Sequence, residues 1–505
     1  MNTSGEGCQS ARDLSLLELL HPDGFASQAL VLGSGCPSSL EPASPLGTGD
    51  VADLILAVPS ASECRTPGWL RGAVQTISQK LHEQGIAYIL VPPRLRAQVR
   101  KLLADQGLCS NQALMHLPGQ ETSRYILPLD PISIRSFFSK VLPVSRWGRL
   151  AITFGFQFFQ GDQFFMRAWP AVGLVVCRPG ARPLCEWLFR LDGQADRSGS
   201  VIIRRGWRGR NGAVILYRFM EGEQSPSAVG KVGMSQQLFR RLVREAECLD
   251  RLGPHARTAG ARVPERLSLE PIQRCPVLLQ TMIEGEPLSS LLAAQPHRLP
   301  GITDALVSWL ERWNSATMVT RTVDRPFLDE ALLNRAALLA PFFEYGEQYR
   351  NELMQRCAKV IGVPSPLVST HNDLTMWNIM LSEPRSLGII DWESARECAL
   401  PFVDFFYAMT DAVAVARARG SRLEAFKECF AVDGACQSLL SQYLMRLRRV
   451  VQVPDEMVGL CFHACWLHHA ANEQRSTGSS EPRPFLQLVQ WLSQNKASLC
   501  RWVHA

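Results

Sequence analysis

A polar loop between two apolar runs most limits what this chain can fold into. Residues 369 to 380, STHNDLTMWNIM, place a histidine, two asparagines and an aspartate among apolar side chains. A second apolar run, LGII at 387 to 390, ends in Asp391. Polar side chains beside buried strands are costly unless they hydrogen-bond, bind a ligand or do chemistry. We therefore take these two segments as the candidate site.

The spacing of the oxygen-bearing side chains suits phosphate chemistry. Asp373 and Asn378 lie five residues apart, so one loop can present a carboxylate and an amide oxygen together. Asp391 can add a carboxylate from a neighbouring strand, and such hard oxygen ligands are those that Mg²⁺ prefers. Phosphoryl transfer mainly requires positioning of donor and acceptor and neutralisation of phosphate charge. We expect the three oxygens to converge on one site.

The same residues carry a family resemblance. HNDLTMWNIM followed by GIIDWE resembles the signature of the aminoglycoside phosphotransferase and choline kinase families, relatives of the protein kinases. A glycine-bearing hairpin, a strand lysine, a helix glutamate, a hinge strand and a helical lobe also come in that family's order. The resemblance covers roughly residues 196 to 505. It implies an α+β bilobal protein-kinase-like domain that uses ATP and Mg²⁺.

The resemblance implies roles for the matched residues of the loop. Asp373 would be the catalytic base, which orients the acceptor hydroxyl and accepts its proton. Asn378 and Asp391 would be the Mg²⁺ ligands. His371 would brace the loop by hydrogen bonding, and Asp404 in PFVDFFYAM would support it.

Three other residues around the motif are interpreted by their type. Glu393 either binds a second metal or holds a neighbouring backbone or basic group. Trp377 is expected to pack in the core, and a contact with the substrate is the alternative. Asn372 stands where relatives often have glycine, and asparagine tolerates left-handed backbone geometry better than most residues.

In the smaller lobe the resemblance implies a nucleotide site. Lys231 would reach the α- and β-phosphates, and Glu245 would hold it in an ion pair, with Glu247 as a competing partner. The nucleotide base is expected against the hinge, whose matched residues are Gln280, Met282 and Ile283.

The glycine turn of the hairpin departs most from the family pattern. RRGWRGRNGAV offers glycines that allow close backbone approach to phosphates, namely Gly206, Gly209 and Gly212. Its arginines either add charge at the phosphates or form a solvated hairpin tip; they are Arg205, Arg208 and Arg210.

The amino-terminal region follows an α/β pattern. Apolar runs at 29–35, 51–60 and 86–93, with a helix at 71–85 closed by Gly85, indicate a Rossmann-like parallel sheet. The tract resembles the latter half of class I methyltransferases, with VLGSGCP as the glycine turn. Only fifteen residues separate Gly35 from Val51, which is too few for the second and third strands of that family. We expect a shortened methyltransferase-like domain without activity.

These patterns divide the chain into four parts. They are a shortened Rossmann-like domain at 1–130, an aromatic connector at 131–195, a kinase-like N-lobe at 196–300, and a helical C-lobe with the catalytic loop at 301–505. The polar segment LDGQADRSGS at 191–200 is the preferred boundary between the first two parts and the last two.

Composition excludes several classes of protein. The chain has 505 residues, a net charge of +6 and no run of basic residues alternating with aromatic ones, so we expect no nucleic-acid partner. Fifteen cysteines without a Cys-x-x-Cys pair, and no secretory signal, favour the cytoplasm. The apolar window 150–177 is too interrupted to span a bilayer, which leaves a membrane-surface contact as an alternative. Cys461, Cys465 and His468 have helical spacing that suits either a zinc site or an apolar helix face.

The sequence therefore predicts an ATP- and Mg²⁺-dependent phosphotransferase that acts on a hydroxyl of a small molecule. A sugar, a lipid-linked compound or another metabolite is favoured over an aminoglycoside, because a polycation would call for a strongly acidic cleft. The alternative is a catalytically weak kinase-like scaffold that binds nucleotide. The acceptor, the choice between ATP and GTP, S-adenosylmethionine binding and the oligomeric state are left open.

Overall fold

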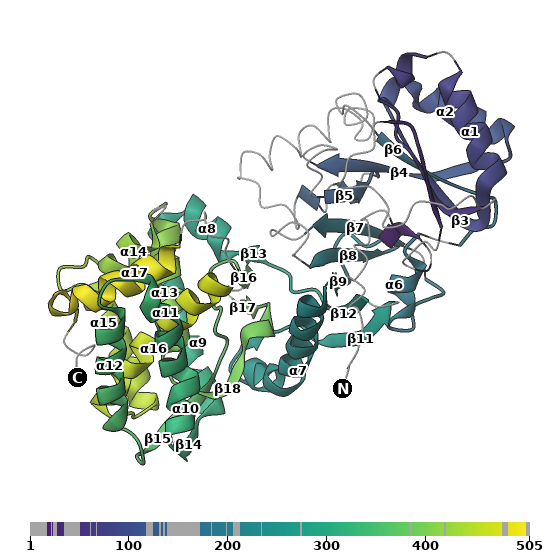
Figure 1. Cartoon of the computed structure of the whole chain (residues 1–505). Coiled ribbons are helices and arrows are strands. Elements are labelled where there is room, and N and C mark those ends of the chain that lie inside the picture. The colour runs from purple at the N-terminus through teal and green to yellow at the C-terminus, as the bar shows by residue number, and fades with distance from the viewer. Residues whose placement is uncertain are drawn as a thin grey trace, which may run out of the picture. The chain divides into compact units, whose positions relative to one another are not determined.

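A computed structural model of the chain is drawn in Figure 1. It describes residues 18–21, 23, 28–34, 51–60, 62–66, 68–117, 125–130, 133–134, 137–138, 172–182, 184–197, 199–205, 213–233, 235–272, 275–382, 386–418, 421–476 and 483–500. The chain forms two compact units, Met1–Ala246 with Arg266–Met282, and Glu247–Glu265 with Ile283–Ala505. The four-part division expected from the sequence stays a prediction.

One mixed sheet runs through the first unit. Its eleven strands follow the order β1-β2-β3-β6-β4-β5-β7-β8-β9-β12-β11. Pairing is parallel from β1 to β3 and antiparallel across all the other neighbours. The bounds are β1 (Ala29–Leu32), β2 (Ala52–Ala57), β3 (Leu81–Val91), β4 (Cys109–Leu117), β5 (Tyr125–Pro128), β6 (Val172–Cys177), β7 (Gly199–Arg205), β8 (Val214–Met220), β9 (Ala228–Val232), β11 (Arg266–Ile272) and β12 (Cys275–Thr281). The expected parallel arrangement is thus limited to three strands.

The helix between β2 and β3 ends earlier than the sequence suggested. Helix α1 spans Trp69–Lys80, and β3 begins at Leu81, so Gly85 lies in a strand and closes no helix. A Cβ atom at Gly85 would come within 2.9 Å of the Asp53 carbonyl oxygen. Glycine is needed there because two backbones approach closely. From the sequence alone, such a glycine looks the same as one that ends a helix. Helix α2 (Arg96–Asp105) follows β3.

Strand β6 comes from the segment that the sequence predicted as a connector. All six of its residues are buried, and it pairs with β3 on one side and β4 on the other. A strand covered on both faces has no alternation of polar and apolar residues, so the period-two signal was missing. Most of the apolar window 150–177 lies outside the described residues, and its last six residues are this buried strand.

Gly173 in β6 provides a test of this pairing. A Cβ atom there would lie 1.8 Å from the hydroxyl oxygen of the fully buried Tyr88 on β3. We expect Gly173→Ala to lower the free energy of unfolding by about 1–3 kcal/mol through overpacking. Gly72→Ala is the control, since nothing lies within 4 Å of that site in α1 and alanine favours a helix. Equal denaturation midpoints for Gly173→Ala and wild type would contradict the β3–β6 packing.

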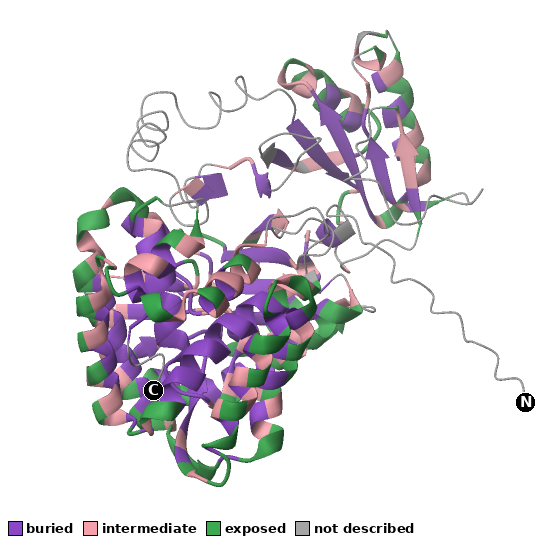
Figure 2. Ribbon diagram, turned by 60° about the vertical axis from the view of Figure 1, so that its left-hand side comes forward, coloured by how far each residue is buried: buried purple, intermediate pink, exposed green. Residues whose placement is uncertain are grey.

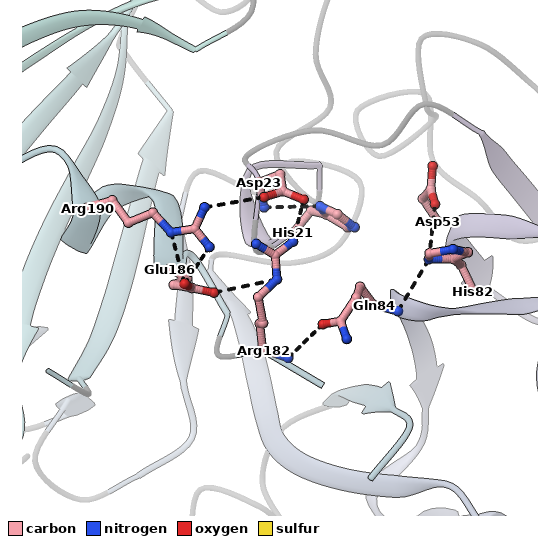
Figure 3. A network of polar contacts seen from close by, with 8 residues as sticks. All are labelled: His21, Asp23, Asp53, His82, Gln84, Arg182, Glu186 and Arg190. Carbon is pink, nitrogen blue, oxygen red and sulfur yellow. Dashed lines mark hydrogen bonds and ion pairs between the residues drawn. The ribbon is translucent and has the colours of Figure 1, made fainter. Parts of the chain in front are cut away.

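The first described residues of the chain are held against helix α6 (Glu186–Arg190). The carbonyl of Leu19, in η1 (Glu18–Leu20), accepts a 2.9 Å hydrogen bond from the Trp187 indole. Figure 3 shows the adjoining charges: Arg182 lies 2.5 Å from the Asp23 carboxylate and 3.7 Å from that of Glu186. These contacts hold the first described residues against α6 and the segment that precedes it.

Helices cover both faces of the sheet at β9. Leu188 of α6 meets the backbone on one face, where a Cβ atom at Gly230 would lie 3.2 Å from its side chain. On the other face helix α7 (Gln236–Thr258) packs through Leu242 and Ala246 against Leu278 of β12. Figure 1 shows α7 beside β9 and β12. Lys231, the neighbour of Gly230, belongs to this second face because side chains alternate along a strand.

The second unit is mostly helical. Figure 2 shows its buried residues gathered in the interior and its exposed residues on the outer faces of the helices. Its helices are α8 (Leu288–Ala294), α9 (Leu299–Thr317), α10 (Arg325–Leu328), the π-helix η7 (Asp329–Leu333), α11 (Asn334–Leu339), α12 (Gly346–Ala358), α13 (Val403–Ala416), α14 (Arg422–Phe430), α15 (Gln437–Val450), α16 (Asp455–Ser476) and α17 (Pro484–Gln494). In the described part of the chain, no helix has the length and apolar character needed to cross a membrane.

Two small sheets complete this unit and hold the candidate loop. One has the order β10-β17-β16-β13 and the other β14-β15-β18. Their bounds are β10 (Ala261–Arg262), β13 (Glu286–Pro287), β14 (Val319–Thr322), β15 (Pro364–Thr370), β16 (Ile379–Ser382), β17 (Ser386–Ile389) and β18 (Arg396–Ala399). The candidate loop connects β15 to β16.

Candidate active site

The hairpin of β16 and β17 brings the two sequence segments together. Ile379 is the register partner of Ile389, and the Ile390 N–H donates a 3.0 Å hydrogen bond to the Asn378 carbonyl. Asn378 therefore immediately precedes one paired strand end, while Asp391 follows the other. Asn378 and Asp391 were expected to lie near each other, and the antiparallel pairing of β16 with β17 brings their backbones to the same end of the hairpin.

Asp373 and Asn378 are joined directly. The Asn378 amide nitrogen donates to the Asp373 carbonyl at 2.9 Å and to its carboxylate at 3.0 Å. The amide's oxygen, the atom that a cation would use, is therefore not the one that holds Asp373. Burial raises the pKa of the Asp373 carboxyl to about 8, helped by the negative charges of Asp391 and Glu393, while the Asn378 hydrogen bond acts in the opposite direction.

His371 holds the two segments together. Its Nε2 lies 3.1 Å from the Ile390 carbonyl oxygen, and its Nδ1 lies 3.3 Å from the Asp373 backbone nitrogen. A carbonyl can only accept and a backbone N–H can only donate, so the proton belongs on Nε2. The fully buried imidazole ring thereby links the candidate loop to the end of β17, which leads into Asp391.

Two residues of the site have left-handed backbone geometry. Asn372 has a φ of 62°, and its side-chain amide donates a 3.1 Å hydrogen bond to the Ser394 carbonyl. Asp391 has a φ of 71°. Such conformations are costly for residues other than glycine and collect at functional sites, where surrounding contacts maintain them.

Asp404 supports the loop from helix α13. Its carboxylate accepts hydrogen bonds from the backbone N–H groups of His371 at 2.7 Å and Asn372 at 2.8 Å. Burial raises the pKa of Asp404 to about 6, and these two hydrogen bonds oppose the change. Asp404 therefore holds the backbone at the start of the candidate loop.

A second carboxylate on α13 was missed by sequence reasoning. Asp411 accepts a 2.7 Å hydrogen bond from the Met376 N–H, and its other oxygen lies 2.8 Å from the Arg422 guanidinium. Asp411 follows Asp404 by seven residues, two helical turns, so both carboxylates lie on the face of α13 that meets the loop. The available signal was a pair of aspartates at this spacing in the otherwise apolar helix VDFFYAMTDAVAVA.

The Asp411–Arg422 pair yields a stability prediction. We expect Arg422→Gln to lower the free energy of unfolding by about 1–3 kcal/mol, because the buried Asp411 carboxylate then loses its cation. Adding Asp411→Asn should recover part of that loss. The exposed Arg325–Asp329 pair is the control, and Arg325→Gln should cost less than about 1 kcal/mol. Equal losses in denaturant titrations at the two sites would contradict this account.

The nucleotide-site residues of the first unit also come together in part. The Lys231 ammonium lies 2.7 and 2.8 Å from the two carboxylate oxygens of Glu245, which is fully buried, whereas Glu247 is exposed. Gln280 is buried and is the register partner of Val229, two residues before Lys231. The expected glycine turn, Gly206, Gly209 and Gly212, lies outside the described residues.

Met282 and Ile283, which are expected to contact the nucleotide base, lie where the chain passes from the first unit to the second. Met282 closes the first unit and packs against the apolar cluster that contains Val229, and Ile283 is the first residue of the second unit's main segment. Their role toward a nucleotide stays a prediction.

Trp377 corrects an expectation. The sequence suggested that it packs in the core, but its side chain is 58% exposed. Leu374 and Met376, its apolar neighbours in the loop, are fully buried. Successive positions of an irregular loop can face different directions, and no periodicity in the sequence reports which one faces solvent.

The cysteines and histidine of α16 lie in the apolar core. Cys461 and Cys465 are fully buried, and burial raises the pKa of both thiols, which opposes the thiolate form that zinc needs. The His468 Nε2 lies 3.0 Å from the Asn472 side-chain amide. Among the described residues, no three His, Cys, Asp or Glu side chains form a group that could hold a metal ion.

Comparison with known families places this geometry in a recognised domain. Residues 216–433 match the phosphotransferase enzyme family. The match includes Lys231, Glu245, Asp373, Asn378 and Asp391, and it supports the family resemblance over this region of the chain. No curated protein matches the chain. The likeness of the amino-terminal region to methyltransferases stays a prediction.

Several solved structures are similar to the chain. An aminoglycoside phosphotransferase from Streptomyces rimosus, in complex with ADP and streptomycin, has 15% identity and a TM-score of 0.34, covering 50% of this chain and 90% of that one. A choline kinase from Streptococcus pneumoniae has 15% identity and a TM-score of 0.36, covering 58% and 92%. A macrolide 2'-phosphotransferase from Brachybacterium faecium has 14% identity and a TM-score of 0.31, covering 58% and 98%.

Proposed function

We propose that the protein transfers a phosphate group from ATP, in a Mg²⁺-dependent reaction, to a hydroxyl of a small molecule. The observation that carries the proposal is the joined pair of Asp373 and Asn378 at the end of the hairpin that leads to Asp391. The family match over residues 216–433 supports phosphate transfer as the class of reaction. A sugar, a lipid-linked compound or another metabolite remains favoured over an aminoglycoside.

In this proposal the loop does the positioning. The Asp373 carboxylate, held at 3.0 Å by the Asn378 amide, orients the acceptor hydroxyl and takes its proton as the oxygen–phosphorus bond forms. His371, Asp404 and Asp411 keep the loop backbone in place through their hydrogen bonds. The group that accepts the proton is thereby held in a fixed position before substrate arrives.

The donor set of the loop fits Mg²⁺. Asn378 and Asp391 offer one amide oxygen and one carboxylate, and Mg²⁺ is usually held by one or two protein oxygens together with phosphates and water. Bound Mg²⁺ would supply charge neutralisation for the phosphates. The negative charge of Glu393 also raises the pKa of the Asp373 carboxyl, and we propose Glu393 as a ligand of a second metal ion.

In the first unit, the Lys231–Glu245 ion pair would hold the phosphates of the nucleotide in position. A lysine held by a buried carboxylate presents its positive charge in a fixed direction, as the binding of α- and β-phosphates requires. The nucleotide base would lie along Gln280, Met282 and Ile283. These roles are proposals that follow from the family match and the observed pair.

The test is a nucleotide-turnover and phosphate-transfer assay with Mg²⁺ and a panel of acceptor alcohols. We expect EDTA to abolish transfer and Asp391→Asn to reduce it at least 100-fold, because one of two proposed ligands loses its charge. Asp433→Asn, an exposed carboxylate in the turn after α14, is the matched control. Wild-type transfer that persists in EDTA and in Asp391→Asn would refute the proposal, and nucleotide binding without transfer would favour the scaffold alternative.

A further inference from the structure

Trp377 differs from the other tryptophans of the described chain. Its indole is 58% exposed, whereas the others described are buried or half-buried. It also occupies the position directly before Asn378 and four residues after Asp373, inside the catalytic loop. The loop thus buries its other apolar side chains and presents its largest one to solvent, one residue before Asn378 in the sequence.

The backbone on both sides of Trp377 is fixed. The Met376 N–H is bound to Asp411 at 2.7 Å, and the Asn378 N–H is bound to the Thr375 carbonyl at 3.0 Å. The backbone that carries the indole is therefore already ordered before a ligand covers it. An indole in this setting is a preorganised apolar surface for a flat ligand face.

The carboxylates that α13 presents to the loop are already engaged. Asp404 accepts two backbone hydrogen bonds, and Asp411 is paired with Arg422. Asp391 and Glu393 are already assigned to the proposed metal site. Neither α13 carboxylate is therefore available to balance the charge of a cationic acceptor, which favours an uncharged acceptor over a cation held by ion pairs. A cation held on the indole face is the competing outcome, and the choline arm of the test detects it.

We infer that Trp377 is the acceptor platform of the site, on which the apolar face of an uncharged, polyhydroxylated ring of the pyranose type stacks. Stacking there brings one ring hydroxyl to Asp373. The inference rests on the proposed phosphotransferase function and names its acceptor class. Trp377 acts in specificity, since it holds the ring whose hydroxyl reacts.

The test compares acceptors and variants in one assay. The probes are a panel of uncharged hexoses, with glucosamine and choline as cationic acceptors and glycerol as an acceptor without a ring. We expect a hexose to be the best acceptor. For that hexose, Trp377→Ala should raise the acceptor KM at least 10-fold and Trp377→Phe by a smaller factor. The KM for Mg²⁺–ATP should stay within about twofold of wild type, because a loss confined to acceptor binding appears in the KM of the acceptor.

The matched control is Met445→Ala, which removes a side chain of similar exposure, 52%, from helix α15. Circular dichroism checks that all variants fold. An unchanged hexose KM in Trp377→Ala, or transfer to choline or glucosamine in preference to every hexose, overturns the inference while the proposed function stands. A wild-type protein that transfers phosphate to no acceptor overturns both.

Discussion

Asp373→Asn is expected to lower the rate of phosphate transfer by about 10²–10⁴-fold, the usual contribution of a positioned general base. The asparagine amide has nearly the shape of the carboxylate, and its oxygen can still accept the 3.0 Å hydrogen bond from Asn378. The proton of the acceptor hydroxyl, however, has no base to receive it. Steady-state transfer to the best acceptor, with Mg²⁺–ATP in excess, measures the effect in kcat.

Two readouts separate this loss from misfolding. Calorimetric affinity for Mg²⁺–ATP should stay within about threefold of wild type, because Asp373 is not itself one of the proposed Mg²⁺ ligands or nucleotide contacts. The thermal unfolding midpoint should be equal or higher, because a neutral amide replaces a largely buried carboxylate whose pKa is raised by burial and by Asp391. A variant that retains more than a tenth of wild-type kcat would show that Asp373 is not the base.

Lys231→Met is expected to destabilise the first unit by about 3–5 kcal/mol, the usual cost of removing one partner from a buried ion pair. Glu245 is fully buried and Lys231 is 13% exposed, so water cannot replace the lost ammonium at the carboxylate. The variant should also bind Mg²⁺–ATP at least 10-fold more weakly, because the proposed phosphate contact is gone. Chemical denaturation and calorimetry measure the two effects.

A double variant separates stability from binding. Lys231→Met with Glu245→Leu should regain most of the lost unfolding free energy, because the buried Glu245 carboxylate is removed together with the lysine. The same protein should remain weak in nucleotide binding. Recovery of nucleotide affinity along with stability would mean that Lys231 acts through the fold rather than at the phosphates.

The contacts of the candidate loop could be predicted largely from the sequence. Asp373, Asn378 and Asp391 lie within nineteen residues, and a single hairpin, β16–β17, is enough to bring them together. The family resemblance then supplied the bracing roles of His371 and Asp404, and the structure places both side chains in hydrogen bonds to the loop or its neighbouring strand. The Lys231–Glu245 contact was equally accessible, since one strand and one adjacent helix carry it.

Other features depended on contacts that no local pattern reports. Strand β6 enters the sheet between β3 and β4 from far along the chain, and burial on both faces removes its periodicity. The Asp411–Arg422 contact joins α13 to α14 across a loop, and no spacing in the sequence indicates that these two residues pair. Sheet pairing and buried ion pairs of this kind are decided by tertiary packing.

The sequence by itself determined the chemical groups of the site and the short segments that carry them, because their spacing along the chain limits where they can lie. Only the tertiary structure decided which groups hold the loop and which side chain the loop presents to solvent. Exposure is a property of all the neighbours together, and for Trp377 those neighbours leave the indole 58% exposed beside Asn378. The proposed acceptor platform therefore follows from packing, whereas the proposed reaction follows from the motif.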